Sequence, residues 1–282
     1  MAPPRRHRTL LATLAAGAFA LQPLCSEAQT SAPRGAWRYQ VSIYGYLPSV
    51  DGTTRFPPNA DGGGGGTLPS LDVDLGGITD NIQGFFMASF EADNGRWGMF
   101  TDFMYLHAGN DRQNSRDFTI GGVLDASTSA NLGWDLSGSI WTLAGKYRVH
   151  ASPTTPVDFL FGARRAEITQ ELTFDISGSI GTLPPAARTG RAEHSETLWD
   201  GIIGVKGRHV FGPGRRWSLP FYLDVGAGES KLTWQAAAGV GYAFSWGEIS
   251  MLWRYLAYEM KEGKPTKDLS FNGPMIGASF TF

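Results

Sequence analysis

The chain has 282 residues, a formal net charge of −2 and a mean hydropathy of −0.17. Such a charge gives no excess of basic residues for binding nucleic acid, and a chain with one cysteine, Cys25, has no disulfide framework. After the N-terminal segment, no stretch reaches the ~18 to 20 consecutive apolar residues of a membrane-spanning helix. We expect no metal site and no cofactor.

The first 28 residues predict export. A basic stretch over residues 1–8 precedes an apolar run over residues 9–24, and small residues occupy the positions before a cut after Ala28. This arrangement is typical of a cleaved secretory signal, and the run is too short for a resident transmembrane helix. A lipoprotein anchored through Cys25 is the rival interpretation, but that signal needs a small residue where Leu24 stands.

The rest of the chain alternates apolar and polar residues with a period of two, which indicates β-strands. The clearest run extends from Leu232 to Trp246. Abundant aromatic residues combined with low mean hydropathy fit a membrane barrel, in which lipid-facing and lumen-facing residues cancel in the average, although a secreted β-sandwich would share this composition. The alternation predicts strands over residues 37–48, 82–93, 96–107, 137–149, 157–174, 197–211, 216–227, 231–245, 248–260 and 269–282.

The lengths of the connections separate these two architectures. Compact connections at 93–96, 151–156, 212–214 and 245–247 all fall at one end of the strands. Long loops at 49–81, 108–136 and 175–196 fall at the other end, and the first contains the Gly62–Gly66 run, read as a flexible insert. Outer-membrane barrels have short periplasmic turns, long external loops and an even number of strands. We therefore predict an all-β fold: a single transmembrane antiparallel up-and-down β-barrel over residues 29–282, with about ten strands and with eight or twelve as alternatives.

One predicted strand breaks the alternation. Phe159 and Phe161 share one face, whereas Ile168, Leu172 and Phe174 have the opposite parity. A β-bulge near residues 163–166, or exit of the strand above the membrane, would account for the change.

Several segments resemble a family of small, porin-like outer-membrane β-barrels of bacteria. They are Trp37–Tyr39, Tyr44–Pro48 with Asp51 and Gly52, Gly95–Gly98 with Asp102 and Tyr105, Trp199–Gly204, Trp217–Leu219, Asp224–Gly226, Trp234 with Gln235, Gly241 with Tyr242, and Arg254–Leu256. The resemblance implies the barrel fold and the bacterial outer membrane as location, with outer-membrane lipid and the barrel-assembly machinery as partners. Known outer-membrane proteins further imply that the final aromatic residues, Phe280 and Phe282, form the signal that this machinery reads. These motifs are strand signatures, so they imply no activity.

If the aromatic faces contact lipid, the opposite faces line the interior. The charged residues that this parity places inside are Arg38, Glu91, Asp102, Lys146, Arg148, Asp158, Arg164, Asp200, Lys206, Arg208, Asp224 and Arg254. Buried charges are costly unless paired. The near-balanced set is therefore read first as an ion-pair network that fills the lumen, and second as the lining of a narrow water path. About ten strands lie near the size that side chains can fill, which argues against a general diffusion pore.

Three functional interpretations remain open. The leading one is a narrow channel for small solutes or ions, and the alternative is a surface-binding or structural barrel with a plugged lumen. The third is an outer-membrane hydrolase of the omptin or lipid-modifying kind, with His194 between Glu193 and Glu196 as an oriented base and with Asp72 and Asp74 nearby. Polar residues are common in loops, so we assign no catalytic residue and expect no enzyme. The oligomeric state is left open.

Overall fold

The computed structural model describes residues 36–56, 61–62, 71–74, 82–113, 118–120, 129–178, 186–264 and 266–282. All of them belong to one compact unit, Pro33–Phe282. The predicted signal over residues 1–28 lies outside the described residues and stays a prediction. In the described part of the chain, no helix is long and apolar enough to cross a membrane.

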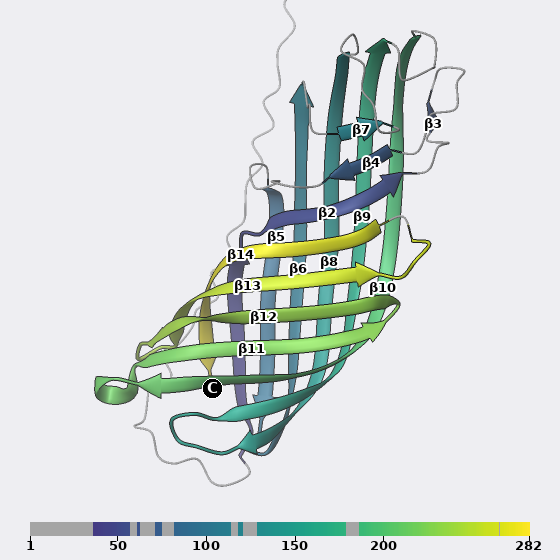
Figure 1. The fold of residues 1–282 in the computed structure, drawn as a ribbon. Coiled ribbons are helices and arrows are strands. Elements are labelled where there is room, and N and C mark those ends of the chain that lie inside the picture. Colours follow the sequence, from purple (N-terminus) through teal and green to yellow (C-terminus); the bar gives the residue numbers. More distant parts are fainter. Residues whose placement is uncertain are drawn as a thin grey trace, which may run out of the picture. The chain divides into compact units, whose positions relative to one another are not determined.

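Ten strands form a closed antiparallel barrel (Figure 1). Neighbours along the barrel pair antiparallel, and β1 closes it by pairing with β14 from Gln40↔Thr281 to Tyr46↔Met275. The predicted all-β barrel of ten strands is therefore confirmed. Its strands are β1 (Arg38–Tyr46), β5 (Ile82–Asp93), β6 (Trp97–Gln113), β8 (Ser129–His150), β9 (Val157–Gly178), β10 (Ala186–Phe211), β11 (Trp217–Gly228), β12 (Ser230–Ala243), β13 (Glu248–Met260) and β14 (Thr266–Thr281).

Four compact turns join strands at one end of the barrel. They connect β5 to β6, β8 to β9, β10 to β11 and β12 to β13, and β1 begins and β14 ends at the same level, where Tyr39 and Phe282 exchange two backbone hydrogen bonds of 2.9 Å. In the turn between β5 and β6, two residues favour the reversal of the chain. Gly95 adopts a φ of 86°, and the Asn94 side chain accepts hydrogen bonds from the backbone N–H groups of Arg96 and Trp97. By the rule for outer-membrane barrels, this is the periplasmic end.

The segment predicted as the first long loop, 49–81, contains strands. β2 (Ser49–Phe56) pairs with β14, and β4 (Leu71–Asp74) pairs with β2. β7 (Phe118–Ile120) then pairs with β4, so that the sheet continues past β14 (Figure 1), while β3 (Asp61–Gly62) pairs with β10. β3, β4 and β7 are too short to show an alternation, and β2 has only two large apolar residues, Val50 and Phe56.

Strands also run into the segments predicted as the second and third loops, 108–136 and 175–196. β8 and β9 each have 22 residues and β10 has 26, whereas about 9–11 tilted residues are enough to cross a bilayer. These strands continue past the extracellular membrane surface together with β6. We call the parts at residues 107–113, 129–139, 167–178 and 186–197 the extracellular sheet.

The break in alternation on β9 is a change of environment, not a bulge. β9 pairs with β8 and β10 without any register shift from Ala163 to Ala166, so the predicted bulge is wrong. Leu160, Arg164 and Ile168 are all buried on the inward face. Near the turns, the outward residues are apolar and the inward residues carry the lumen charges; in the extracellular sheet, the outward residues are polar, and the inward residues combine apolar Leu136 and Ile168 with polar Gln170 and Glu196. Lipid surrounds the first zone and water the second, which matches the predicted exit of this strand above the membrane.

Candidate functional site: the barrel interior

The structure places the twelve predicted lumen charges on inward faces or at the periplasmic mouth. Arg38 and Arg208 are at the mouth, with side chains 51% and 47% exposed. The others face the lumen, which they reach from seven strands: Glu91, Asp102, Lys146, Arg148, Asp158, Arg164, Asp200, Lys206, Asp224 and Arg254. Parity therefore located these side chains, and it is the pairing between strands that gathers them into groups.

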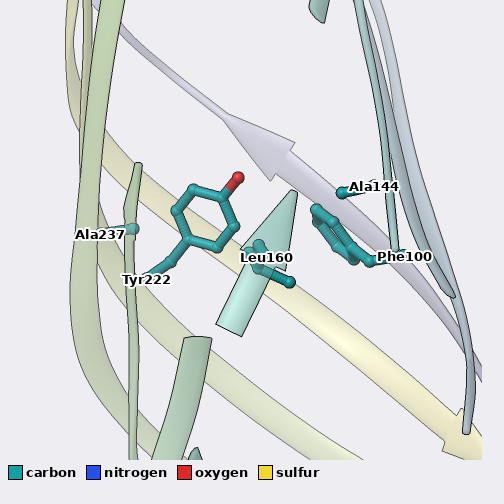
Figure 2. Packing of buried hydrophobic residues seen from close by; sticks show 5 residues of the cluster. All are labelled: Phe100, Ala144, Leu160, Tyr222 and Ala237. Carbon is teal, nitrogen blue, oxygen red and sulfur yellow. The ribbon is translucent and has the colours of Figure 1, made fainter. Parts of the chain in front are cut away.

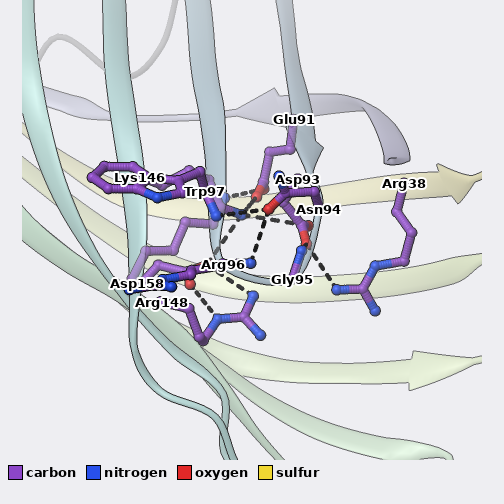
Figure 3. Close-up of polar contacts among 11 residues, drawn as sticks. Arg38, Glu91, Asp93, Asn94, Gly95, Arg96, Trp97, Lys146, Arg148 and Asp158 are labelled. Carbon is purple, nitrogen blue, oxygen red and sulfur yellow. Dashed lines mark hydrogen bonds and ion pairs between the residues drawn. The ribbon is translucent and has the colours of Figure 1, made fainter. Parts of the chain in front are cut away.

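Glu91 is the centre of a cluster near the periplasmic end (Figure 3). It accepts a hydrogen bond from Lys146 at 3.0 Å and another from Lys206. Lys146 also contacts Asp158 at 3.1 Å, and Asp158 pairs with Arg148. Four strands contribute to this cluster, and each carboxylate contacts two cations, so the desolvation of each charge is offset by its partners.

A cavity of about 290 Å³ lies around this cluster. Two ion pairs stand among its lining residues: Arg38–Asp93 at 2.8 Å and Arg208–Glu248 at 3.5 Å. Asp93 and Glu248 were not predicted from the sequence. Asp93 ends β5 and Glu248 begins β13, each beside a turn, where a carboxylate is expected to be exposed to water.

Arg254 on β13 is the centre of a second polar group, on the extracellular side of the Glu91 cluster. Its guanidinium donates to Asp102 at 2.9 Å, to Gln235 at 2.8 Å and to the Tyr44 hydroxyl at 3.2 Å. Tyr44 in turn donates to Asp102 at 2.6 Å. The guanidinium lies 5.6 Å from the ring centroid of Tyr46. This arrangement joins opposite walls of the barrel across the lumen.

Arg164 on β9 forms a second bridge across the lumen. Its side chain is fully buried, pairs with Asp224 and donates to Thr142 and Thr233, each at 3.2 Å. Tyr222 also donates to Asp224, at 2.5 Å. Neutral inward residues such as Tyr44, Gln235 and Tyr222 were absent from the predicted set, although the same parity that found the charges places them inside.

A group of apolar side chains packs on the periplasmic side of these bridges, and Phe100, Tyr222 and Ala237 of this group also line the 290 Å³ cavity. Leu160 meets Phe100, Ala144, Tyr222 and Ala237 in the interior (Figure 2). Farther toward the extracellular side lies a cavity of about 30 Å³, large enough to hold water. No residue lines both cavities. The largest fully buried side chains of the described residues are Arg164, Tyr46, Tyr258, Leu160, Leu198 and Leu256.

The rim residues considered for catalysis do not converge. Glu193 is exposed on the outward face, whereas His194 and Glu196 are partly buried. His194 Nε2 is 3.9 Å from Glu196 Oε2, and Lys264 contacts Glu196 at 2.6 Å. Asp72 and Asp74 belong to β4, which pairs with β2. His194 is therefore not held between two carboxylates, as the sequence order suggested.

A different histidine is paired on the outward face of the extracellular sheet. His107 Nε2 lies 3.0 Å from both carboxylate oxygens of Asp135. Ser137 and Thr169 continue the row that starts at His107, and Ser195 follows on β10, where its hydroxyl is 3.0 Å from that of Thr169. Only cross-strand register brings these residues together, so the sequence offered no signal for them.

The chain ends in aromatic side chains that face outward. Phe280 and Phe282 are exposed, at 40% and 70%, and the ring of Phe280 packs at a tilt against Trp246 with 5.4 Å between ring centroids. Their reading by the assembly machinery stays a prediction. Within the described ranges, no three His, Cys, Asp or Glu side chains form a group that could hold a metal ion.

Comparisons with known proteins bear on the fold. No protein-family model matches the chain, and no curated protein matches it in sequence. Among solved structures, the outer membrane protease OmpT from Escherichia coli is similar, with 9% sequence identity, a TM-score of 0.53, and coverage of 90% of this chain and 99% of OmpT. Ail, the attachment invasion locus protein of Yersinia pestis, is 13% identical over 87% of this chain and 99% of Ail, with a TM-score of 0.33.

The closed ten-stranded barrel, its outward apolar zone and its likeness to OmpT define the class: the chain has the fold of a bacterial outer-membrane β-barrel. At 9% identity the likeness to OmpT concerns the fold alone.

Proposed function

We propose that this protein is a closed outer-membrane barrel whose lumen is plugged by its own side chains, and whose extracellular sheet binds a polar ligand at the cell surface. The observation that carries the proposal is the packed layer between the two cavities, in which Arg164 is fully buried. Narrow-channel transport, the leading interpretation from the sequence, needs a continuous water path, and this layer opposes one.

The extracellular sheet supports the binding part of the proposal. Rows of polar side chains cross four strands on its outward face, one of them formed by His107, Ser137, Thr169 and Ser195. Hydroxyls spaced at the ~4.8 Å separation of paired strands offer repeated donors and acceptors on a rigid surface. This chemistry suits an extended, hydroxyl-bearing ligand such as an oligosaccharide.

Single-channel recording tests the closed lumen. The mature chain is refolded, its folded state is verified by heat-dependent mobility in gel electrophoresis, and it is inserted into a planar bilayer under voltage. We expect no conductance steps from the wild type. Reproducible steps that change ion preference in Arg254→Ala would overturn the plugged barrel and support the channel.

That channel is the second candidate, and the 290 Å³ cavity favours it. Water can reach the Asp102–Arg254 pair from the periplasmic side, since both residues line the cavity. In a channel with this pair as a gate, the double variant Asp102→Ala/Arg254→Ala would conduct steadily. In a barrel plugged by the whole packed layer, the double variant stays silent.

An oligosaccharide array tests the surface. We expect the wild type in detergent to bind at least one class of oligosaccharide, and Ser137→Ala/Thr169→Ala/Ser195→Ala to bind it more weakly with the barrel intact. The matched control is Ser42→Ala/Ser279→Ala, which removes a pair of lumen hydroxyls 2.8 Å apart. Equal losses in both variants would count against this surface.

We propose that the chain is not an enzyme, since the His194–Glu196 pair is separated by 3.9 Å and Glu196 is held by Lys264. Turnover of a fluorogenic peptide that His194→Ala abolishes without loss of folding would contradict this. The partners we propose are outer-membrane lipid and the barrel-assembly machinery.

A further inference from the structure

Two turns at the periplasmic end carry the same Arg-Trp dipeptide. Arg96-Trp97 begins β6, and Arg216-Trp217 begins β11. The barrel order β6-β8-β9-β10-β11 places three strands between them. The two dipeptides therefore lie on separate sectors of the barrel wall.

The two sites have the same construction. Each tryptophan pairs directly with a tyrosine on the next strand, Trp97 with Tyr147 and Trp217 with Tyr242. Their ring centroids are 4.6 Å and 4.9 Å apart. In both, the residue after the tyrosine donates its backbone N–H to the carbonyl of the arginine, at 2.8 Å and 2.7 Å.

The guanidinium groups are also held alike. Arg96 donates to the Tyr147 hydroxyl at 3.5 Å, and Arg216 donates to the Tyr242 hydroxyl at 3.5 Å. Arg96 is further placed 5.8 Å from the centroid of the Tyr147 ring. Each contact uses one of the five N–H donors of the guanidinium, so most donors of both arginines remain available to a ligand.

These two arginines differ from their neighbours at the mouth in their charge partners. Arg38 and Arg208 pair with carboxylates. Within the described part of the chain, neither Arg96 nor Arg216 has a carboxylate within 4.0 Å. The described side chains thus leave two positive charges without a carboxylate partner at the level of the aromatic belt.

That belt fixes the environment of the two charges. Trp97 and Trp217 are exposed on the outward face, and contacting rings continue the belt through Phe244, Trp246 and Phe280. Tryptophan and tyrosine collect at the level of lipid headgroups. A guanidinium at this level faces the phosphates of the periplasmic leaflet, whose geometry it matches with paired N–H donors.

We propose that Arg96–Trp97–Tyr147 and Arg216–Trp217–Tyr242 are two equivalent binding sites for the phosphodiester headgroup of an anionic phospholipid in the periplasmic leaflet. The guanidinium binds the phosphate, the tyrosine hydroxyl orients the guanidinium, and the tryptophan packs against the upper acyl chain. This inference does not depend on the plugged lumen or on the extracellular ligand.

Native mass spectrometry of the refolded full chain tests it, with phosphatidylglycerol titrated into detergent micelles. We expect up to two retained lipids on the wild type. Arg96→Gln and Arg216→Gln should each weaken one site about fivefold, so that each variant retains less lipid than the wild type at the same lipid concentration and the double variant retains least. Tyr147→Phe, which keeps the ring and removes the hydroxyl, should weaken one site in the same way.

Arg208→Gln is the matched control, because it removes a mouth arginine that already has a carboxylate partner. The proposal is overturned if the double variant retains two lipids, or if Arg208→Gln reduces retention as strongly as Arg216→Gln. Displacement of the lipid by an equal concentration of inorganic phosphate would also overturn it, since it would indicate a site for soluble anions. If Arg96→Gln does not fold, the double variant Tyr147→Phe/Arg216→Gln takes the place of Arg96→Gln/Arg216→Gln, because it also alters one residue in each of the two sites.

Discussion

Tyr44 and Arg254 are 210 positions apart in the chain, and the tyrosine hydroxyl accepts a hydrogen bond from the guanidinium at 3.2 Å. Both side chains also bind Asp102. β1 and β13 flank β14, the strand at which the barrel closes. The contact therefore joins the first strand to the last ones from inside the lumen, and it adds side-chain bonds to the backbone pairing of β1 with β14.

Removing one member of the Asp102–Arg254 pair should destabilise the barrel strongly. Arg254→Ala leaves a carboxylate buried without its cation, which costs about 3–5 kcal/mol. The double variant Asp102→Leu/Arg254→Met leaves no uncompensated charge and should lose less than the sum of the single variants. Urea unfolding in lipid vesicles measures both. Lys231→Ala, which breaks an exposed pair with Glu259, should change little; a loss for Arg254→Ala as small as for Lys231→Ala would contradict the expectation.

Two outward positions on β10 should differ in their tolerance of arginine. Ile203 is 54% exposed in the apolar zone, where an arginine facing lipid costs about 2–4 kcal/mol near the bilayer midplane. Thr197 faces outward on the same strand in the extracellular sheet, and Thr197→Arg should be neutral because water surrounds it. Equal unfolding free energies for Ile203→Arg and Thr197→Arg would place the membrane boundary elsewhere.

Gly95→Ala should cost about 1–2 kcal/mol, the penalty of a side chain in the left-handed region. At this position φ is +86° and nothing lies within 4 Å of an added Cβ, so strain is the whole effect. Gly84→Ala is the control: it has the same open space and its φ is outside the left-handed range. The difference in unfolding free energy between the two variants isolates the backbone term.

Phe282→Ala should reduce assembly into the outer membrane of cells while leaving refolding into vesicles nearly unchanged. The Phe282 side chain is exposed, and its backbone keeps the two hydrogen bonds to Tyr39 after the substitution. The amount of protein in isolated outer membranes is compared with the refolded fraction in vitro. A parallel fall in both would mean that the ring stabilises the barrel and that the assembly signal lies elsewhere.

The barrel strands were predictable because lipid and lumen impose opposite demands on successive residues. The run from Leu232 to Trp246 shows this, with Trp234 outward and Gln235 inward in β12. The extracellular ends of β6, β8 and β10 were assigned to loops, because alternation between lipid and lumen stops where water surrounds the strand. On β9 the predicted strand included Ile168, and the change of parity there was the sign that the strand leaves the membrane.

The partners inside the lumen could not be predicted. Asp102 and Arg254 are separated by 152 positions, and their meeting depends on strand stagger around the barrel. Charge balance predicted that pairs would form, but it did not assign Arg164 to Asp224 or Lys206 to Glu91. The Arg-Trp turns were visible as dipeptides, and only the register with Tyr147 and Tyr242 shows that they are equivalent.

The swap of polarity along β9 has a consequence for the accuracy of strand pairing. A slip of one residue against β8 turns every side chain to the opposite face. In the membrane-spanning part of β9, the slip would move Asp158 and Arg164 into lipid. In the extracellular sheet, it would expose Ile168 to water and bury Glu167. A misaligned β8–β9 hairpin thus costs free energy both where lipid surrounds it and where water surrounds it. The parts of the strands beyond the bilayer therefore help to align the parts that cross it.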